Sequence, residues 1–330
     1  MPSGGGGVRR TQTHNGANLV SSQSVLVTGG AGFIGSHLVR RLLSDGFHVR
    51  ILDNFATGRK SNLEGIDGFE IHDGDIRSPS DVRRAVRDVD AVFHLAALPS
   101  VARSWKDPVS TLAVNAHGTA NLVEAAAENG VSAFIYSSSS SIYGDQPADR
   151  KSEDMDPKPI SPYGYSKLLG EKIALAHARA PQGLRVVALR YFNVFGPRQD
   201  PDSPYAAVIP LFISHALAGT TATIDGDGTQ SRDFTYVDNV IDANVCALES
   251  ATSGLAMNIA CGASHTLLEL VDAISALNDH PLKTVFGPQR QGDIKHSLAD
   301  ISRAAAEISY EPRVSFQDGL RKAFDEYRPA

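Results

Sequence analysis

The sequence predicts an α/β fold, with a large doubly wound parallel sheet followed by a smaller mixed α/β domain. From residue 24 onward, short apolar runs alternate with helical patterns, as is typical of parallel strands covered by helices on both faces. A length of 330 residues suits one large unit with a smaller one appended. Prolines at 197, 201, 204 and 210 then interrupt the pattern, so we expect the second domain to begin near residue 190.

The order of the elements follows from the apolar runs. Strands are expected at 24–28, 48–53, 69–76, 90–97, 132–138 and 183–193. Helices are expected at 33–46, near 80–87 and at 114–130. Residues 1–22 are expected to form a disordered tail, followed by domains at 23–190 and 191–330. A segment near 234–260 is expected to return to the first domain.

The composition excludes several classes of function. Apolar residues make up 42% and charged residues 21%, and the net charge of −6 comes without a long basic run, so no nucleic-acid partner is expected. The two cysteines, Cys246 and Cys261, give neither a disulfide framework nor metal-ligand spacing, so no metal is expected. No segment approaches 18 apolar residues, so we expect no membrane span and a cytoplasmic protein.

A glycine motif follows the first predicted strand and opens the first predicted helix. Two residues separate Gly29 from Gly32, and two more separate Gly32 from Gly35. In this context the motif predicts a Rossmann-like dinucleotide site, because glycines let the backbone approach a pyrophosphate at a helix N-terminus. Asp53 ends the second strand, where a carboxylate binds the adenosine ribose and repels a 2′-phosphate, which favours NAD over NADP. Arg59 and Lys60 lie close by, a feature that would suit NADP instead.

Five consecutive serines, at 137–141, begin inside the fifth predicted strand. By composition they could form a flexible linker. However, they lie at the carboxyl end of a central strand, and open α/β sheets bind their ligands at these strand ends. We therefore expect this run to carry hydroxyl groups into an active site.

A second motif, SPYGYSK at 161–167, supplies a partner for these serines. Ser161 can cap a helix, and Pro162 suits its first position. Tyr163 and Lys167 are then i and i+4 on one helix face, whereas Tyr165 points elsewhere. The lysine is expected to lower the pKa of the Tyr163 phenol, which is otherwise too weak a base near neutral pH.

Together these motifs resemble the extended short-chain dehydrogenase/reductase family. TGGAGFIG, DGDI, HLAA, NAHGT, the serine run, YGYSK and RYFN occur in that family's order, from about residue 24 to the C-terminus. The resemblance implies bound NAD, with Tyr163 and Lys167 as catalytic residues. It also implies that Ser139, four residues before Tyr143, hydrogen-bonds the reacting oxygen. Ser140 and Ser141 would support it or pack nearby.

The resemblance also implies a set of cofactor contacts. Asp75 and Ile76 would hold adenine, residues 95–97 would line the pyrophosphate, and Asn115 and Phe192 would approach the nicotinamide. Residues 95–97 would be core in any sheet, and Asn115 could be structural. The full set is Gly29, Gly32, Phe33, Ile34, Gly35, Asp53, Asn54, Thr57, Gly58, Asp75, Ile76, Leu95, Ala96, Ala97, Asn115, Tyr163, Lys167 and Phe192.

Within the family, these residues favour simple hydride removal and return. The dehydratases carry an Asp-Glu pair where Ser140 and Ser141 stand here, and the decarboxylases tend to carry a glutamate that is absent. A 4-epimerase needs no further acid or base. Tyr163 would take the O4 proton, NAD would take the C4 hydride, and the hydride would return to the other face of the 4-ketone. The cofactor should remain bound throughout.

The later segments resemble those that meet the nucleotide and sugar in UDP-hexose 4-epimerases. Asn193, Arg232 and Arg290 would bind the diphosphate, and Asp293 the uridine ribose. Ser297 would act as a gate, since a small residue leaves room for a 2-N-acetyl group and a tyrosine does not. The expected substrate contacts are Ser139, Ser140, Ser141, Tyr163, Asn193, Val208, Ile209, Pro210, Arg232, Arg290, Asp293 and Ser297.

We therefore expect interconversion of UDP-GlcNAc and UDP-GalNAc, with UDP-Glc/UDP-Gal as a second activity. Relatives are often homodimers paired through the helices near 114–129 and 163–179, so a homodimer is expected. One alternative is a UDP-glucuronate 4-epimerase, although such sequences tend to carry threonine where Asn193 stands and arginine where Asp200 stands. The other is a non-catalytic nucleotide-sensing protein on the same fold, against which Tyr163 and Lys167 argue.

Overall fold

The computed structural model describes residues 23–180, 183–289 and 294–328, so the expected tail at 1–22 lies outside it. The described residues form a main sheet of seven parallel strands in the order β11-β6-β5-β4-β1-β2-β3. The strands are β1 (Ser24–Thr28), β2 (His48–Asp53), β3 (Phe69–Asp73), β4 (Ala91–His94), β5 (Ala133–Ser139), β6 (Arg185–Tyr191) and β11 (Leu255–Ile259). The predicted doubly wound α/β class is confirmed.

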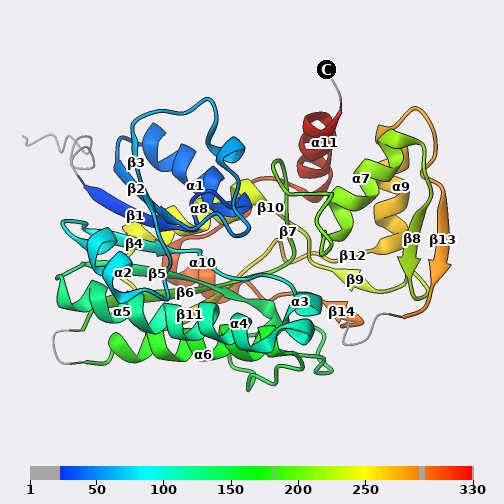
Figure 1. Ribbon diagram of the computed structural model, residues 1–330. Coiled ribbons are helices and arrows are strands. Elements are labelled where there is room, and N and C mark those ends of the chain that lie inside the picture. Colours follow the sequence, from blue (N-terminus) through cyan, green and yellow to red (C-terminus); the bar gives the residue numbers. More distant parts are fainter. Residues whose placement is uncertain (1–22, 181–182, 290–293, 329–330) are drawn as a thin grey trace, which may run out of the picture.

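Helices cover both faces of this sheet (Figure 1). On one face lie α1 (Phe33–Ser44) and α8 (Val237–Glu249), and on the other lie α2 (Pro79–Val86), α5 (Thr119–Glu128) and α6 (Pro162–His177). Each strand contributes side chains to the hydrophobic cores on both faces of the sheet, because successive side chains point to opposite faces. In β1, Val25 and Val27 pack in the cluster that contains α1, and Leu26 packs in the cluster that contains α5.

Several expected elements have different bounds in the structure. β3 ends at Asp73 rather than at 76, β4 covers only 91–94, and β6 covers only 185–191. The helix expected at 114–130 begins as a π-helical turn, Ala113–Gly118, and continues as α5. Two helices that precede it were not expected from the sequence, α3 (Val101–Lys106) and α4 (Pro108–Leu112). Their N-caps are Ser100 and Asp107, whose side chains accept hydrogen bonds from the N–H groups of Arg103 and Ser110.

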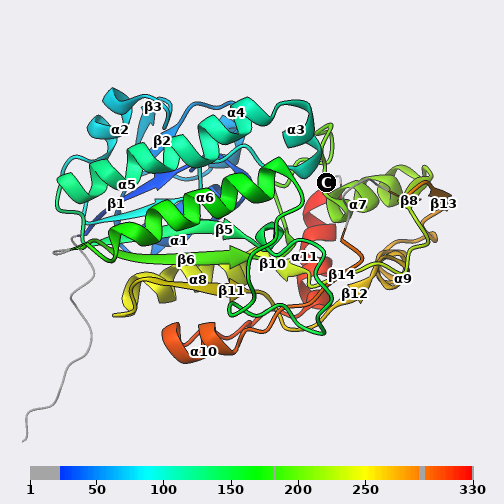
Figure 2. The same cartoon turned by 90° about the horizontal axis from the view of Figure 1, so that it is seen from below.

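A second lobe lies beyond the carboxyl ends of the main strands (Figures 1 and 2). Its helices are α7 (Val208–Ala218), α9 (Leu267–Leu277) and α11 (Phe316–Tyr327). Its short strands pair as β7 (Val194–Phe195) with β10 (Thr235–Tyr236), β8 (Ala222–Asp225) with β13 (Thr284–Gly287), and β9 (Ser231–Arg232) with both β12 (His265–Thr266) and β14 (His296–Ser297). The chain then returns through α10 (Ser302–Ile308), which packs near β11. In the described ranges, no helix is both long and apolar enough to cross a membrane.

A buried ion pair ties α6 to the main sheet. The guanidinium of Arg190 on β6 donates two hydrogen bonds to the carboxylate of Glu171 on α6, with Nη2–Oε1 at 2.7 Å and Nε–Oε2 at 3.0 Å. These side chains are only 5% and 1% exposed. Ser138 at the end of β5 donates to Glu171 Oε2 at 2.6 Å. Every oxygen of the carboxylate therefore has a donor.

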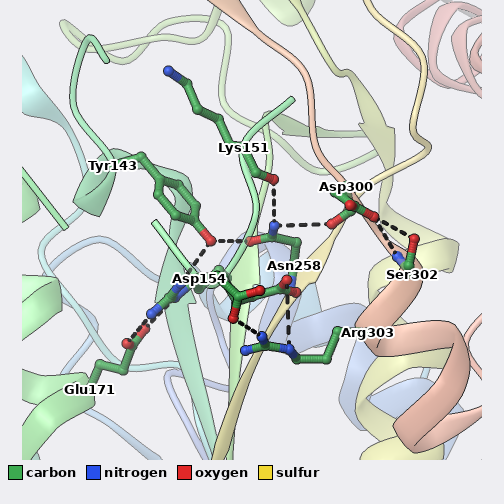
Figure 3. Close-up of polar contacts among 10 residues, drawn as sticks. Tyr143, Lys151, Asp154, Glu171, Asn258, Asp300, Ser302 and Arg303 are labelled. Carbon is green, nitrogen blue, oxygen red and sulfur yellow. Dashed lines mark hydrogen bonds and ion pairs between the residues drawn. The ribbon is translucent and has the colours of Figure 1, made fainter. Parts of the chain in front are cut away.

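The same network continues to β11 and to the chain segment before α10 (Figure 3). Nη1 of Arg190 donates to the Tyr143 hydroxyl at 2.7 Å, and that hydroxyl donates to Oδ1 of Asn258 at 2.7 Å. The amide nitrogen of Asn258 donates to the carbonyl oxygens of Lys151 and Asp300. One connected set of hydrogen bonds thus runs from α6 through the sheet to the returning chain beside α10.

We predict that Glu171→Gln destabilises the protein by about 3–5 kcal/mol, because the Arg190 charge would stay buried without a counter-charge. The measurement is the free energy of unfolding in urea. Adding Arg190→Met to Glu171→Gln should recover part of that loss. Lys172→Gln, at an exposed position on the same helix, should have little effect. A double variant no more stable than Glu171→Gln would show that the uncompensated charge is not the cause.

Candidate active site

A cavity of about 1190 Å³ lies between the carboxyl edge of the main sheet and the second lobe. The strand order reverses between β1 and β4, which is where open α/β sheets bind dinucleotides. Most of the expected contacts line this one cavity. They are Gly29, Gly32, Phe33, Ile34, Gly35, Asp53, Asn54, Thr57, Gly58, Asp75, Ile76, Leu95, Ala96, Ala97, Ser140, Ser141, Tyr163, Asn193, Val208, Ile209, Arg232 and Ser297.

The glycine loop forms a cradle in which the backbone segments pack too closely for side chains. Gly29 has a φ of 70°, and a Cβ built on it would lie 2.8 Å from the backbone nitrogen of Ala96. A Cβ on Gly35 would lie 2.1 Å from the carbonyl oxygen of Gly29. The bare backbone therefore packs closely and leaves the N-terminus of α1 open to the cavity. This arrangement fits a dinucleotide pyrophosphate.

Two carboxylates stand at adjacent strand ends beside this loop. Asp53 accepts from the N–H of Ala31 at 2.9 Å and from the N–H of Phe55 at 2.8 Å, and burial raises its pKa. Asp75 accepts from the amide of Asn54 at 2.9 Å, and the Arg77 guanidinium beside it lowers its pKa to about 2. Asp53 keeps further lone pairs for the hydroxyl donors of an adenosine ribose. The Asp75 carboxylate also accepts from the backbone N–H of Arg77 at 2.8 Å and from its Nη2 at 2.7 Å, so an adenine amino group would have to compete with Arg77 for it.

The reacting groups lie where the end of β5 meets the start of α6. Ser161 caps the helix by accepting from the N–H of Gly164 at 3.1 Å, so the predicted cap is confirmed. Tyr163 lines the cavity, and its hydroxyl lies close enough to that of Ser139 for the serine to lower its pKa. Ser139 is 8% exposed and lies behind the cavity wall, which Ser140 and Ser141 line. The last two serines are thus closer to the cavity than expected.

The expected pKa of the tyrosine is wrong for this structure. Burial raises the pKa of Tyr163 above its usual value, and the neighbouring Ser139 hydroxyl offsets this only in part. Lys167 is not among the groups that shift it, and burial lowers the pKa of the lysine itself to about 7, with Glu171 acting in the opposite direction. The Lys167 ammonium lies 4.8 Å from the centre of the Tyr136 ring. Near neutral pH the lysine therefore carries only part of a positive charge.

Other expected residues lie behind the cavity wall. Lys167 is 4% exposed, Phe192 is fully buried against Tyr143, and Pro210 is buried in the first turn of α7. Asn115 is 1% exposed and binds residue Leu98 through two hydrogen bonds, at 2.7 and 3.1 Å, so it positions a segment that lines the cavity. This geometry favours a structural role for Asn115 over a contact with the nicotinamide.

On the second lobe, two expected substrate residues are neighbours. Ser297 on β14 pairs in parallel register with Arg232 on β9, and both line the cavity. Asn193 has a φ of 34° and donates from its amide to the carbonyl oxygen of Asp233 at 3.2 Å. The predictions for Arg290 and Asp293 fall outside the described residues.

Part of the cavity wall comes from residues that were not expected from the sequence. Ser100, Arg103 and Lys106 of the α3 region line it, as does Tyr205. The Arg103 guanidinium and the Lys106 ammonium lie 5.0 and 5.4 Å from the centre of the Tyr205 ring. The signal was present in the sequence, since Ser100 and the Asp107-Pro108 pair both resemble helix starts.

Comparisons with known proteins agree with this geometry. The model of the NAD dependent epimerase/dehydratase family matches residues 25–260. The chain is 40% identical over 309 residues to a UDP-glucose 4-epimerase of Mycolicibacterium smegmatis, covering 92% of this chain and 98% of that protein.

Two solved structures illustrate the range of similar proteins. A UDP-N-acetylglucosamine 4-epimerase from Methanobrevibacter ruminantium, in complex with UDP-N-acetylmuramic acid, is 41% identical with a TM-score of 0.88, covering 93% of this chain and 98% of that one. A UDP-glucuronic acid 4-epimerase from Bacillus cereus, in complex with UDP-glucuronic acid and NAD, is 36% identical with a TM-score of 0.84, covering 92% and 98%. With its glycine cradle, its paired acids and its Tyr163–Ser139 contact, the chain belongs to the NAD dependent epimerase/dehydratase family.

Proposed function

We propose that the chain is an NAD-dependent UDP-sugar 4-epimerase that works through a 4-keto intermediate. The observation that carries this proposal is the composition of the cavity wall beside Tyr163. Ser140 and Ser141 occupy it where a dehydratase would need an additional acid and base. Without such a pair, the site would support only loss and return of the O4 proton at Tyr163, with the C4 hydride exchanged with NAD. The relatives, which include several UDP-sugar 4-epimerases, support the same reaction.

In this mechanism Tyr163 takes the proton from the sugar O4 and later returns it. Bound NAD would supply a hydride acceptor and, in its oxidised form, a positive charge that favours the phenolate. Ser139, which lies beside the phenol, would orient it by a hydrogen bond. Lys167 adds the partial positive charge that its buried position allows, and Glu171 helps to keep it protonated.

We predict that Tyr163→Phe lowers kcat by about 10²–10⁴-fold, because the proton acceptor is lost. Binding of NAD and of UDP-sugar should persist. The measurement is conversion of UDP-Glc, UDP-GlcNAc and UDP-GlcA to equilibrium, with chromatographic separation of the epimers. Ser139→Ala should be milder, since it removes only an orienting hydrogen bond. Tyr165→Phe is the matched control, because Tyr165 is 57% exposed on the same helix. Normal turnover in Tyr163→Phe would contradict the mechanism, and failure to epimerise any of the three sugars would contradict the function.

The preferred substrate is proposed to be the UDP-GlcNAc/UDP-GalNAc pair, with UDP-Glc/UDP-Gal as a second activity. Ser297 supports this choice because it is small, lines the cavity and neighbours Arg232, the expected phosphate contact. One objection to the UDP-glucuronate alternative is that Asp200 would repel the sugar carboxylate. This objection is weaker in the structure, because the Asp200 carboxylate is paired with Arg59. The absence of threonine at 193 and arginine at 200 still argues against that alternative.

We predict that Ser297→Tyr removes activity on the N-acetylated sugars and spares activity on UDP-Glc. The added ring would occupy the space that an acetamide needs, whereas a hydroxyl needs little. The readout is the ratio of kcat/KM for the two sugars. Ser297→Ala, which stays small, should keep both activities. Equal losses for both sugars in Ser297→Tyr would contradict the proposed gate.

A homodimer is proposed as the assembled form. Exposed apolar side chains gather on α3, α4 and α6, which contact one another on one side of the main sheet (Figure 2). They are Trp105, Val109, Leu112, Tyr165 and Leu169. A surface of this kind favours association with a second copy.

We predict that the wild-type chain sediments at twice the mass of one chain and that Leu169→Asp sediments as a monomer. A buried, unpaired carboxylate would oppose association at this surface. Val285→Asp is the control, because Val285 is similarly exposed, at 51%, but lies on β13 in the second lobe. A wild-type monomer at micromolar concentration would contradict the dimer, and a dimeric Leu169→Asp would place its interface elsewhere.

A further inference from the structure

A loop of the second lobe reaches back to the cofactor side of the cavity. This loop joins β7 to α7. Its Asp200 lines the cavity and forms an ion pair with Arg59, which comes after β2 in the first domain. The two residues are 141 positions apart in the sequence, so no local pattern predicts their contact.

Arg59 lies beside the carboxylate expected to bind the adenosine ribose. Its N–H donates to the carbonyl oxygen of Ala31 at 2.9 Å, and Asp53 accepts from the N–H of the same Ala31 at 2.9 Å. A Cβ built on Gly58 would lie 3.0 Å from the Asp53 carboxylate. If Asp53 holds the ribose, a phosphate on its 2′ oxygen is within reach of the long Arg59 side chain.

Arg59 and Lys60, the two cations that would suit such a phosphate, already have partners. Arg59 is paired with Asp200, and the Lys60 ammonium lies 5.3 Å from the centre of the Phe55 ring. Accommodation of a 2′-phosphate typically uses an arginine near this point. We propose that Asp200 is a cofactor-selectivity residue, which holds the Arg59 guanidinium away from a 2′-phosphate and so adds to the preference for NAD that Asp53 sets.

Contacts beyond the ion pair fix the position of Asp200. His37 on α1 donates from Nε2 to the carbonyl oxygen of Pro197 at 3.0 Å, and burial lowers its pKa to about 4, which keeps it neutral. Arg198 donates from Nε to the Ser36 hydroxyl at 3.2 Å. The loop is therefore anchored on α1, and replacing the Asp200 carboxylate changes a charge while these anchors remain.

The test measures which dinucleotide the full chain retains, with no sugar present. Wild type and Asp200→Asn are incubated with equimolar NAD and NADP until the retained ratio is constant, and the bound nucleotides are then released and quantified. Freed from its partner, Arg59 gains a charge-assisted contact with the 2′-phosphate, so the NADP:NAD ratio should rise about tenfold. The rise should shrink at higher salt, because Arg59 is 54% exposed.

Two further variants make the outcome specific. Asp200→Asn combined with Arg59→Met should return to the wild-type ratio, since the gain requires the guanidinium. Asp202→Asn removes the same charge from an exposed residue of the same loop and should leave the ratio unchanged. An unchanged ratio in Asp200→Asn, a rise that survives Arg59→Met, or loss of both dinucleotides in Asp200→Asn would each overturn the proposal. Because no UDP-sugar enters the assay, its outcome is independent of the proposed epimerase activity.

Discussion

The buried ion pair between Glu171 and Arg190 is the interaction on which the rest of the site depends. Two opposite charges taken out of water persist only where good geometry and further hydrogen bonds compensate for the lost hydration. Here two nitrogens of the guanidinium donate to the carboxylate. Ser138 also donates to the carboxylate, and the Tyr143 hydroxyl accepts from the guanidinium. This requirement fixes α6 against β5 and β6, and α6 also carries Tyr163, the expected catalytic base.

The serines at 137–141 have different partners along the run, and one of them, Ser138, helps to satisfy the buried carboxylate. Ser138 donates to the buried carboxylate, whereas Ser137 lies near the Tyr191 hydroxyl, so these adjacent residues face different partners, as the alternation of side chains along a strand leads one to expect. Ser139 ends the strand and lies beside Tyr163, and the chain then turns so that Ser140 and Ser141 reach the cavity. A stretch that resembles a linker by composition is therefore a strand end in which each of the first three hydroxyls has a defined partner.

The sequence was most informative where a local physical rule applies. The strand positions, the glycine cradle and the Ser161 cap each depend on a few adjacent residues, and the structure has them close to where they were expected. The error in the pKa of Tyr163 has a different origin. Adjacent helical positions indicate that Lys167 is near, but they do not indicate how deeply burial lowers the pKa of the lysine. The short helices α3 and α4 were missed because each has few residues and little periodicity.

Contacts between distant segments were the least predictable, and they concentrate where selectivity is expected. The chemistry lies on the main sheet and α6, whose order follows from a repeating strand–helix pattern. The residues expected to choose the ligand lie mostly on irregular loops and two-residue strands of the second lobe, such as Asp200 and Ser297. Such segments depend on contacts with residues distant in the sequence: Asp200 pairs with Arg59 of the first domain, and Ser297 pairs with Arg232 on the neighbouring strand. A rigid reacting centre with separately held recognition groups lets members of one family keep the same chemistry on different sugars, because a loop substitution can alter the cavity without disturbing the buried network.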